Sequence, residues 1–405
     1  MQYNIVIFGL GYIGLPLINA IESNLDKFKQ ESVSDKIFNK TLTINKIIGY
    51  DINEKVVEGL KEFNSSIIFE SCFEKVKEQI SNQSNIYIVC VPTNVDKNNM
   101  PDYSNVENVI KTISTVYDKN KEDIIISEST VGVGDTRRII SKIIPDAYFG
   151  YCPERLCPNT MHLISNINKV VSCNDTDKLN IITELYSNII SDDNYVVQAS
   201  VEEAEACKLL ENIQRDVNIA LLNEYKHYCD KNNISILDIV NLCSTKYSWV
   251  PFVNGLVGGC CIPVDPYYAI NNVNTVQLGL ISKAREVNEN FVNECYNLIE
   301  KHIIKEKPKT MLILGSSYKV GTFSKQNSKA LGIIRKIQQN FDIEIDILSD
   351  TSIEFKNNYD LAVVLVPDKK FVDLDIMSVL NKTTTLIDLF GLYKEIYSHD
   401  NYITI

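Results

Sequence analysis

Three glycines near the N-terminus constrain this chain more than any other feature of its sequence. Residues 3–8, YNIVIF, form an apolar run that predicts a buried parallel strand, and a helical pattern begins at Leu15. Between them stand Gly9, Gly11 and Gly14, spaced as Gly-x-Gly-x-x-Gly. This order is typical of a dinucleotide fingerprint: the first glycine makes the turn, the second admits the pyrophosphate and the third lets the helix pack on the strand.

An acidic residue ends the next predicted strand, IIGYD at 47–51. Asp51 at this place would bond the adenosine ribose hydroxyls and disfavour a 2′-phosphate, so the cofactor expected is NAD rather than NADP. Asp51 lies 40 residues beyond Gly11, about twice the usual spacing. The polar segment 31–46, interpreted as an insertion or surface loop, accounts for the excess. The alternative is a glycine-rich turn in some other α/β fold.

Composition and charge exclude several classes of protein. The chain has 405 residues, 45% hydrophobic and 23% charged, which suits a globular protein of two or three domains. A net charge of −12 without a Lys/Arg block argues against a nucleic-acid partner, and no apolar run reaches the about 18–20 residues of a membrane span. The eleven Cys lack a CxxC pair, and no two of the four His stand at metal-ligand spacing. We therefore expect a cytoplasmic protein with reduced thiols and no metal.

Strands and helices alternate in two parts of the chain. Residues 86–93 and 123–130 are predicted strands, and they extend a doubly wound α/β sheet. Residues 201–231 have apolar positions at helical spacing with no internal Gly or Pro, which predicts a long helix. Later strands are predicted at 310–315, 343–348, 361–366 and 384–388. We expect two Rossmann-like doubly wound domains, 1–200 and 305–405, joined by the long central helix and a helical middle domain, 201–304.

Two further segments carry residues suited to catalysis. GGCCIPVD at 258–265 sets a thiol beside glycine-rich backbone and near a carboxylate, as a cysteine nucleophile requires. Lys208 and Asn212 stand one turn apart on the long helix and could donate hydrogen bonds to a developing oxyanion. Each has an ordinary alternative: a Cys is often a small buried hydrophobe, and a Lys–Asn pair often a solvated helix face.

Three other polar residues are predicted at the carboxyl ends of strands, where ligands bind in open α/β sheets. Thr93 and Thr130 end the strands at 86–93 and 123–130, and Glu154 follows the apolar run YFGYC at 148–152. Capping of a loop is the alternative for each of them taken alone.

Together these segments resemble the nucleotide-sugar 6-dehydrogenases, the UDP-glucose/GDP-mannose dehydrogenase family. The matching blocks, in order along nearly the whole chain, are GLGYIGLPL (9–17), CVPTN (90–94), ESTVGVGDT (128–136), CPERLCP (152–158), CKLLENIQRDVNIALLNE (207–224), GLVGGCCIPVDPYY (255–268) and KAREVNEN (283–290). The resemblance implies NAD-dependent, four-electron oxidation of the C6 hydroxymethyl of a UDP-sugar to a carboxylate. It also implies a thiohemiacetal and a thioester on Cys261, with Cys260 at the variable position of Gly-Gly-x-Cys.

The resemblance further implies a role for each candidate residue. Lys208 and Asn212 would stabilise oxyanions, and Asp265 would act as a base or order water with help from Thr130 and Glu154. The implied NAD contacts are Gly9, Gly11, Tyr12, Ile13, Gly14, Asp51, Lys55, Thr93 and Thr130. The implied substrate contacts are Glu154, Arg155, Lys208, Asn212, Lys246, Asn254, Gly255, Gly258, Gly259 and Lys319. A homodimer through the helix at 201–231 is expected by the same analogy.

The block PERLCP at 153–158 favours one branch of the family. It resembles the PERxxPG block of UDP-N-acetylhexosamine dehydrogenases, whereas UDP-glucose dehydrogenases tend to show PEFLREG. UDP-GlcNAc is therefore the first expected substrate, with UDP-GalNAc and UDP-ManNAc next, and a UDP-glucose 6-dehydrogenase is the alternative.

Departures from the family pattern lie mostly after Lys319. Gln326 stands where the family has an Arg that contacts the cofactor, Phe323 and Ser324 replace acids, Gly132 replaces a Pro and Asn159 a Gly. They motivate an alternative of another class, a non-catalytic protein that binds NAD or a nucleotide sugar. The retained Cys261, Lys208, Asn212 and Asp265 argue against it. A two-electron hydroxyacid dehydrogenase would need a His base, and no His falls in a candidate block.

Overall fold

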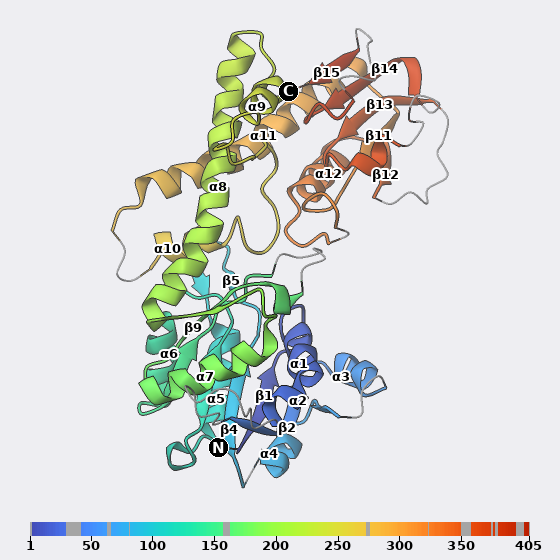
Figure 1. The fold of residues 1–405 in the computed structure, drawn as a ribbon. Coiled ribbons are helices and arrows are strands. Elements are labelled where there is room, and N and C mark those ends of the chain that lie inside the picture. Colours follow the sequence, from blue (N-terminus) through green and yellow to red (C-terminus); the bar gives the residue numbers. More distant parts are fainter. Residues whose placement is uncertain are drawn as a thin grey trace. The chain divides into compact units, whose positions relative to one another are not determined.

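The computed structural model describes residues 2–29, 42–62, 66–80, 82–156, 163–272, 276–322, 324–349, 358–373, 376, 380–393 and 401–404. The chain divides into two compact units (Figure 1). The first unit is Met1–Glu211 with Tyr267–Thr275, and the second is Asn212–Pro266 with Val276–Ile405. The three-domain division drawn from the sequence stays a prediction.

Among the described residues, the first unit is built on a parallel sheet in the order β3-β2-β1-β4-β7-β8. Its strands are β1 (Gln2–Phe8), β2 (Thr43–Tyr50), β3 (Ile68–Glu70), β4 (Ser84–Val89), β7 (Ile124–Ser127) and β8 (Tyr148–Tyr151). The chain builds outward from β1 on one side and then starts again at β4 on the other. The topological switch point, where open α/β sheets bind ligands, therefore lies between β1 and β4.

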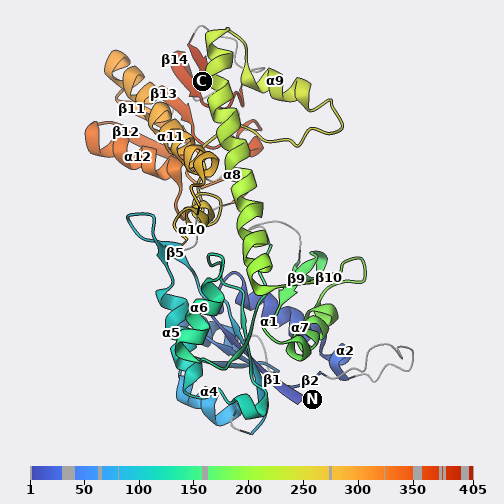
Figure 2. The same cartoon turned by 90° about the vertical axis from the view of Figure 1, so that its left-hand side faces the viewer.

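Helices cover both faces of this sheet, with α5 and α6 on one face and α1 and α7 on the other (Figure 2). The first unit's helices are α1 (Gly14–Ser23), α2 (Leu25–Lys29), α3 (Glu54–Lys61), α4 (Phe73–Ile80), α5 (Ser104–Ser114), η1 (Lys119–Lys121), α6 (Asp135–Ile143), η2 (Ile164–Asn166) and α7 (Thr176–Ile189). Two short pairs complete it: β5 (Asn94–Val95) with β6 (Pro101–Asp102), and β9 (Lys169–Ser172) with β10 (Val196–Ala199). Burial on both faces explains why the strands are continuous apolar runs.

Two local predictions in the first unit were wrong. The helix expected from Leu15 to about Phe28 is split at Asn24, whose side-chain amide donates to the Ala20 carbonyl at 2.8 Å and separates α1 from α2. The polar segment expected at 31–46 is part of β2 from Thr43 onward. The polar side chains at the start of β2 form hydrogen bonds within the sheet: the Asn45 amide donates to Asn4 Oδ1 at 2.9 Å. Residues 30–41 lie outside the described residues.

The long helix α8 (Val201–Lys231) contributes residues to both units and has the bounds that the sequence predicted. The further helices are α9 (Ile236–Cys243), α10 (Asp265–Ile270) and α11 (Gly279–Glu306). A helix of this length is favoured by the absence of internal Gly and Pro, because each such residue would destabilise it by about 1 to 3 kcal/mol.

The second unit contains another parallel sheet, in the order β12-β11-β13-β14-β15 among the described residues. Its elements are β11 (Thr310–Leu314), α12 (Lys329–Asn340), β12 (Glu344–Leu348), β13 (Tyr359–Val364), η3 (Lys369–Phe371), β14 (Leu380–Asp388) and β15 (Tyr402–Thr404). The sequence predicted all of its strands but β15. The switch point of this sheet lies between β11 and β13.

Candidate active site

The glycine turn after β1 has the geometry that a dinucleotide requires. Gly9 has φ of +93°, and a Cβ added to it would lie 2.7 Å from the Cys90 carbonyl oxygen. A Cβ on Gly14 would lie 1.9 Å from the Gly9 carbonyl oxygen. A Cβ on Gly11, in contrast, would have no atom of the described residues within 4 Å. Packing of the chain therefore requires Gly9 and Gly14, while the space beside Gly11 suits a ligand that approaches the backbone.

Asp51 is held beside this turn. Its Oδ2 accepts the Leu10 N–H at 2.8 Å, and its Oδ1 accepts the Asn53 N–H at 2.8 Å. Helix α1 begins with Ile13 as its N-cap, which offers no side-chain acceptor, so the N-terminal N–H groups of this helix are suited to an anionic group. The turn, the helix end and the carboxylate together fit NAD.

The other predicted cofactor residues lie near this edge of the sheet or on the surface next to it. Thr93 follows β4 and Thr130 follows β7, and both are half-buried. Tyr12 is exposed, and Lys55 is exposed at the start of α3. Their contacts with NAD stay predictions.

A buried ion cluster underlies Glu154. Lys169 Nζ lies 2.8 Å from Glu128 Oε2 and 3.6 Å from Glu154 Oε2, and all three side chains are buried. Tyr186 donates its hydroxyl to Glu128 Oε1. Burial lowers the pKa of Lys169, but the charges of Glu128 and Glu154 outweigh this and raise it above its usual value. Burial also raises the pKa of the Glu128 carboxyl, against the effect of Lys169.

Glu154 is also the point at which Lys208 is fixed. Lys208 Nζ donates to the Glu154 main-chain oxygen at 2.7 Å, while Glu154 Oε1 accepts the N–H groups of residues 155 and 156 at 2.7 and 2.6 Å. Arg155 is engaged elsewhere in the first unit: it pairs with Glu211 and donates to the Asn168 carbonyl. Of the predicted site residues in this unit, the structure therefore brings Glu154 and Lys208 together.

In the second unit, Asn212, Asp265 and Cys261 lie together. Asn212 Nδ2 donates to Asp265 Oδ2 at 2.5 Å, and both side chains are buried. The Asp265 N–H donates to the Cys261 carbonyl at 2.8 Å, which fixes the thiol-bearing residue at the start of α10. Cys261 is half-buried, and its Sγ lies 3.6 Å from that of Cys260.

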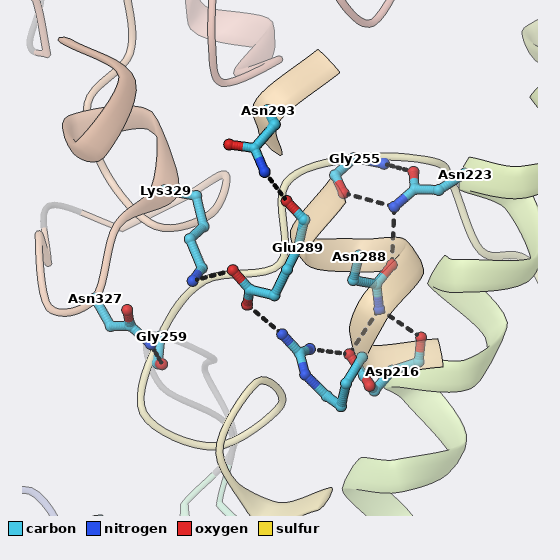
Figure 3. Close-up of polar contacts among 10 residues, drawn as sticks. Asp216, Asn223, Gly255, Gly259, Asn288, Glu289, Asn293, Asn327 and Lys329 are labelled. Carbon is cyan, nitrogen blue, oxygen red and sulfur yellow. Dashed lines mark hydrogen bonds and ion pairs between the residues drawn. The ribbon is translucent and has the colours of Figure 1, made fainter. Parts of the chain in front are cut away.

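The two glycines before these cysteines are required by packing within the second unit. A Cβ on Gly258 would lie 2.9 Å from the Asn327 carbonyl oxygen, and one on Gly259 would lie 2.8 Å from the Tyr318 ring. The Asn327 side-chain amide also donates to the Gly259 carbonyl at 2.9 Å (Figure 3). These glycines therefore seat the cysteine loop against the loop that follows β11.

A pocket of about 160 Å³ lies at the switch point of the second sheet. Its walls are residues 253–256, the loop after β11 with Lys319, and the loop after β13 with Pro367, while Phe390 follows β14. Asn254, Gly255 and Lys319 among the predicted substrate residues line it. Lys246 does not, and its side chain is exposed beyond α9.

Comparison with known proteins agrees with this geometry. Residues 3–190 match the NAD binding domain of the UDP-glucose/GDP-mannose dehydrogenase family, and residues 202–290 match its central domain. The chain belongs to this family. It is therefore an NAD-dependent nucleotide-sugar dehydrogenase, as the sequence predicted.

Three relatives illustrate the range of the family. The chain is 33% identical to UDP-N-acetyl-D-glucosamine 6-dehydrogenase of Salmonella typhi, over 85% of this chain and 82% of that protein. It is 29% identical to Protein CapL of Staphylococcus aureus, over 94% and 91%. The solved structure of a UDP-D-ManNAc dehydrogenase from Pyrococcus horikoshii is 23% identical, with a TM-score of 0.83 over 99% of each chain, and supports the fold.

Several residues that hold the site together were not singled out from the sequence. Lys169 is a lone Lys at the start of an apolar strand, and that oddity was its only signal. Asn223 and Asn288 have the pattern of ordinary polar helix positions.

Of the departures from the family pattern, Gln326 is exposed, whereas Phe323 and Asn159 lie outside the described residues.

Neither a metal centre nor a membrane span is present in the described part of the chain. No group of three or more His, Cys, Asp or Glu side chains there is placed to hold a metal ion. Nor does any helix in that part combine the length and apolarity needed to cross a membrane.

Proposed function

We propose that this dehydrogenase oxidises the C6 hydroxymethyl of a UDP-N-acetylhexosamine, UDP-GlcNAc first, to the uronic acid. The 33% identity to a UDP-N-acetyl-D-glucosamine 6-dehydrogenase and the PERLCP block support an N-acetylated substrate. UDP-ManNAc is the next candidate, because a Pyrococcus horikoshii relative of 28% identity is a UDP-N-acetyl-D-mannosamine dehydrogenase.

Cys261 carries the sugar between the two oxidations. When bound, NAD+ supplies the hydride acceptor, and each oxidation also releases one proton. The Cys261 thiolate adds to the C6 aldehyde to give a thiohemiacetal, which still has a hydride on C6. Loss of that hydride gives a thioester. Water then cleaves the C6–S bond, releasing the carboxylate and returning the thiol.

The contact between Asn212 and Asp265 carries this proposal. Asn212 orients a buried carboxylate that stands one helical turn after Cys261 and is bonded through its own N–H to the Cys261 carbonyl. A carboxylate fixed so close to a thiol in sequence and structure can take its proton or order the hydrolytic water. Lys208 and Asn212 are the proposed oxyanion donors, and Thr130 and Glu154 assist with the water.

The test measures the yield of NADH from a limiting amount of each UDP-sugar with excess NAD. Two NADH per UDP-GlcNAc are expected from the wild type and from Cys260→Ser, and no sustained turnover from Cys261→Ser. The two variants make the same chemical change at adjacent positions, so Cys260→Ser controls for a general effect on the loop.

Other results would change the assignment. Turnover of UDP-glucose alone would assign a UDP-glucose 6-dehydrogenase. Tight binding of UDP-sugar and NAD without NADH formation would assign a binding protein, and Gln326→Arg would then be the first variant to restore turnover. Full activity of Cys261→Ser would overturn the thioester route.

We also propose that the chain forms a homodimer through α8. Leu221, Tyr225 and Tyr228 expose 58%, 43% and 56% of their surface on the second-unit part of this helix. Burial of such side chains is what stabilises a subunit interface. Sedimentation equilibrium should give twice the chain mass for the wild type and the monomer mass for Leu221→Glu. A wild-type monomer would contradict it.

A further inference from the structure

Gly255 lies in the wall of the pocket at the switch point of the second sheet, and one buried side chain bonds its backbone at both the N–H and the carbonyl. The Gly255 N–H donates to Asn223 Oδ1 at 2.8 Å, and Asn223 Nδ2 donates to the Gly255 carbonyl at 3.1 Å (Figure 3). Asn223 lies on α8 and is fully buried. A primary amide is the side chain that can accept and donate in this paired way, and its two ends cannot be exchanged here without breaking both bonds.

The orientation of the Asn223 amide is set by a second amide. Asn223 Nδ2 also donates to Asn288 Oδ1 at 2.9 Å, so Asn288 must present its oxygen to Asn223. Its Nδ2 then donates to the side chain and the main-chain oxygen of Asp216, at 2.7 and 3.0 Å. Asn288 and Asp216 are both buried, on α11 and α8.

Asp216 ends this series, because its Oδ1 accepts from both Asn288 and Arg285. Burial raises the pKa of the Asp216 carboxyl, and the charge of Arg285, which is also buried, opposes this rise. Arg285 pairs in turn with Glu289, and Glu289 accepts from Lys329 at the start of α12, at 2.9 Å (Figure 3). The direction of donation therefore runs from Gly255 through two amides to a carboxylate that is anchored to α11 and α12.

We propose that Asn223 and Asn288 are positioning residues for the UDP-sugar pocket, and that Asp216 fixes the direction of their amides. The proposal rests on the function proposed above, and it takes this pocket, which three of the predicted substrate residues line, as the place that receives the UDP part of the substrate. Neither amide lines the pocket, whereas Gly255 and its neighbours Asn254 and Leu256 do. Their effect reaches the ligand through the Gly255 backbone.

Replacing Asn by Asp tests the direction of the hydrogen bonds, because the side chain keeps its shape and loses its N–H donors. Asn223→Asp puts carboxylate oxygens against the Gly255 carbonyl and Asn288 Oδ1, where only a donor fits. Loss of these buried bonds should displace Gly255. We expect the KM for the UDP-sugar and the Kd for UDP to rise about tenfold or more, with kcat within about twofold of wild type. Binding of NAD, whose glycine turn lies in the first unit, should not change.

The matched control is Asn218→Asp on the same helix. Within the described part of the chain, the Asn218 amide donates to the Gln214 carbonyl of α8, at 2.6 Å. This variant makes the same change in charge and shape, and it should keep the wild-type Kd for UDP. An equal weakening in Asn218→Asp would show that added charge on α8 is responsible, and it would overturn the proposal.

A second variant covers the case in which Asn223→Asp does not fold. Asn288→Ala keeps the ion pair between Asp216 and Arg285 and removes the acceptor that orients Asn223 Nδ2. It should raise the Kd for UDP, because the Asn223 amide is then no longer held toward Gly255. A folded Asn288→Ala with the wild-type Kd for UDP would overturn the proposal.

Calorimetry with UDP alone separates this inference from the proposed function. It needs neither turnover nor knowledge of the sugar. Wild-type protein that binds UDP but oxidises no N-acetyl sugar would defeat the proposed function and leave the amides testable. An active enzyme whose Asn223→Asp variant is folded and binds UDP normally would defeat the inference alone.

Discussion

In both parallel sheets of this dehydrogenase, the first strand in the chain is followed by the same glycine turn. Gly9 follows β1 with φ of +93°, and Gly315 follows β11 with φ of +90°. Each N–H donates at 2.9 Å to the last residue of the neighbouring strand, Tyr50 in one sheet and Leu348 in the other. Each would bring a Cβ into the chain across the switch point, at Cys90 or at Val366. This turn is therefore a requirement of the fold.

The two sheets differ in the segment that comes after the turn. After Gly9, helix α1 begins at Gly14 with the apolar Ile13 as N-cap, so its N–H groups are suited to a diphosphate. After Gly315, a longer loop lines the pocket of the second sheet before α12 begins at Lys329, and Ser328 caps that helix. The first glycine therefore indicates a doubly wound sheet, whereas the residues after it indicate which ligand the sheet binds.

Gly315→Ala should have the largest effect, because the turn is structural in the second sheet too. Its Cβ would lie 2.4 Å from the Val366 Cβ in a backbone conformation that disfavours L side chains. We expect a loss of about 4 kcal/mol in the free energy of unfolding, measured with urea. Gly332→Ala in α12 is the control and should gain about 1 kcal/mol, since no described atom lies within 4 Å of its Cβ. A loss below about 1 kcal/mol for Gly315→Ala would show that the second sheet does not require this turn.

Lys169→Met should have the next largest effect, and only on the first unit. The first sheet buries the Glu128–Lys169–Glu154 cluster beside its ligand edge, whereas Ser316 and Ser349 at the edge of the second share a hydroxyl hydrogen bond. Removing Lys169 leaves two carboxylates buried without their cation and should destabilise the protein by about 3 kcal/mol. Lys111→Met, at an exposed position of α5, should change stability by less than about 0.5 kcal/mol.

The pH dependence of Lys169→Met supplies a second check. Burial raises the pKa of Glu128 in the folded protein, so folding takes up a proton there as the pH falls toward the usual range of a carboxyl. A raised folded pKa means that stability grows with acidification. The deficit of Lys169→Met should therefore shrink between neutral pH and about pH 5. A deficit that widens in acid would show that Glu128 is not the charge left unpaired.

Gly11→Ala should separate ligand binding from folding. A Cβ here meets no described atom within 4 Å, unlike one on Gly9 or Gly14. We expect the stability of the free protein to stay within about 0.5 kcal/mol of wild type and the Kd for NAD to rise about ten- to a hundredfold. Gly59→Ala in α3, also with open space around it, should leave NAD binding unchanged. A destabilised Gly11→Ala with normal NAD affinity would assign this glycine to packing.

The main architecture could be predicted from local patterns in the sequence. Apolar runs that stop at Gly9, Asp51 and Gly315 predict buried parallel strands, and a stretch without Gly or Pro predicts α8. The bounds of short strands could not be predicted in this way. β15 has three residues, and the polar start of β2 is stabilised by Asn–Asn contacts across the sheet that no periodicity encodes.

The supports of the site were harder to predict than its candidate residues. Cys261 and Asp265 are noticeable because a thiol and a carboxylate beside glycines suggest chemistry. Lys169 and Asn288, in contrast, become meaningful only when tertiary structure brings them to partners 41 and 72 positions away in sequence. A single sequence contains no trace of such pairings. The residues that position a site are therefore those that sequence reasoning misses.

Ser328→Ala should have the smallest effect and tests the difference between the two turns most closely. Ser328 Oγ accepts the Leu331 N–H at 3.1 Å and donates to the Ser316 carbonyl at 2.8 Å, so the chain itself satisfies the start of α12. Loss of the cap should cost about 1 kcal/mol of stability, and Ser328→Thr should retain most of it. If urea unfolding instead gives equal stability for Ser328→Ala and wild type, α12 does not depend on this cap. Its N-terminus would then be as open as that of α1, and the division between a helix-end site in the first sheet and a loop site in the second would not hold.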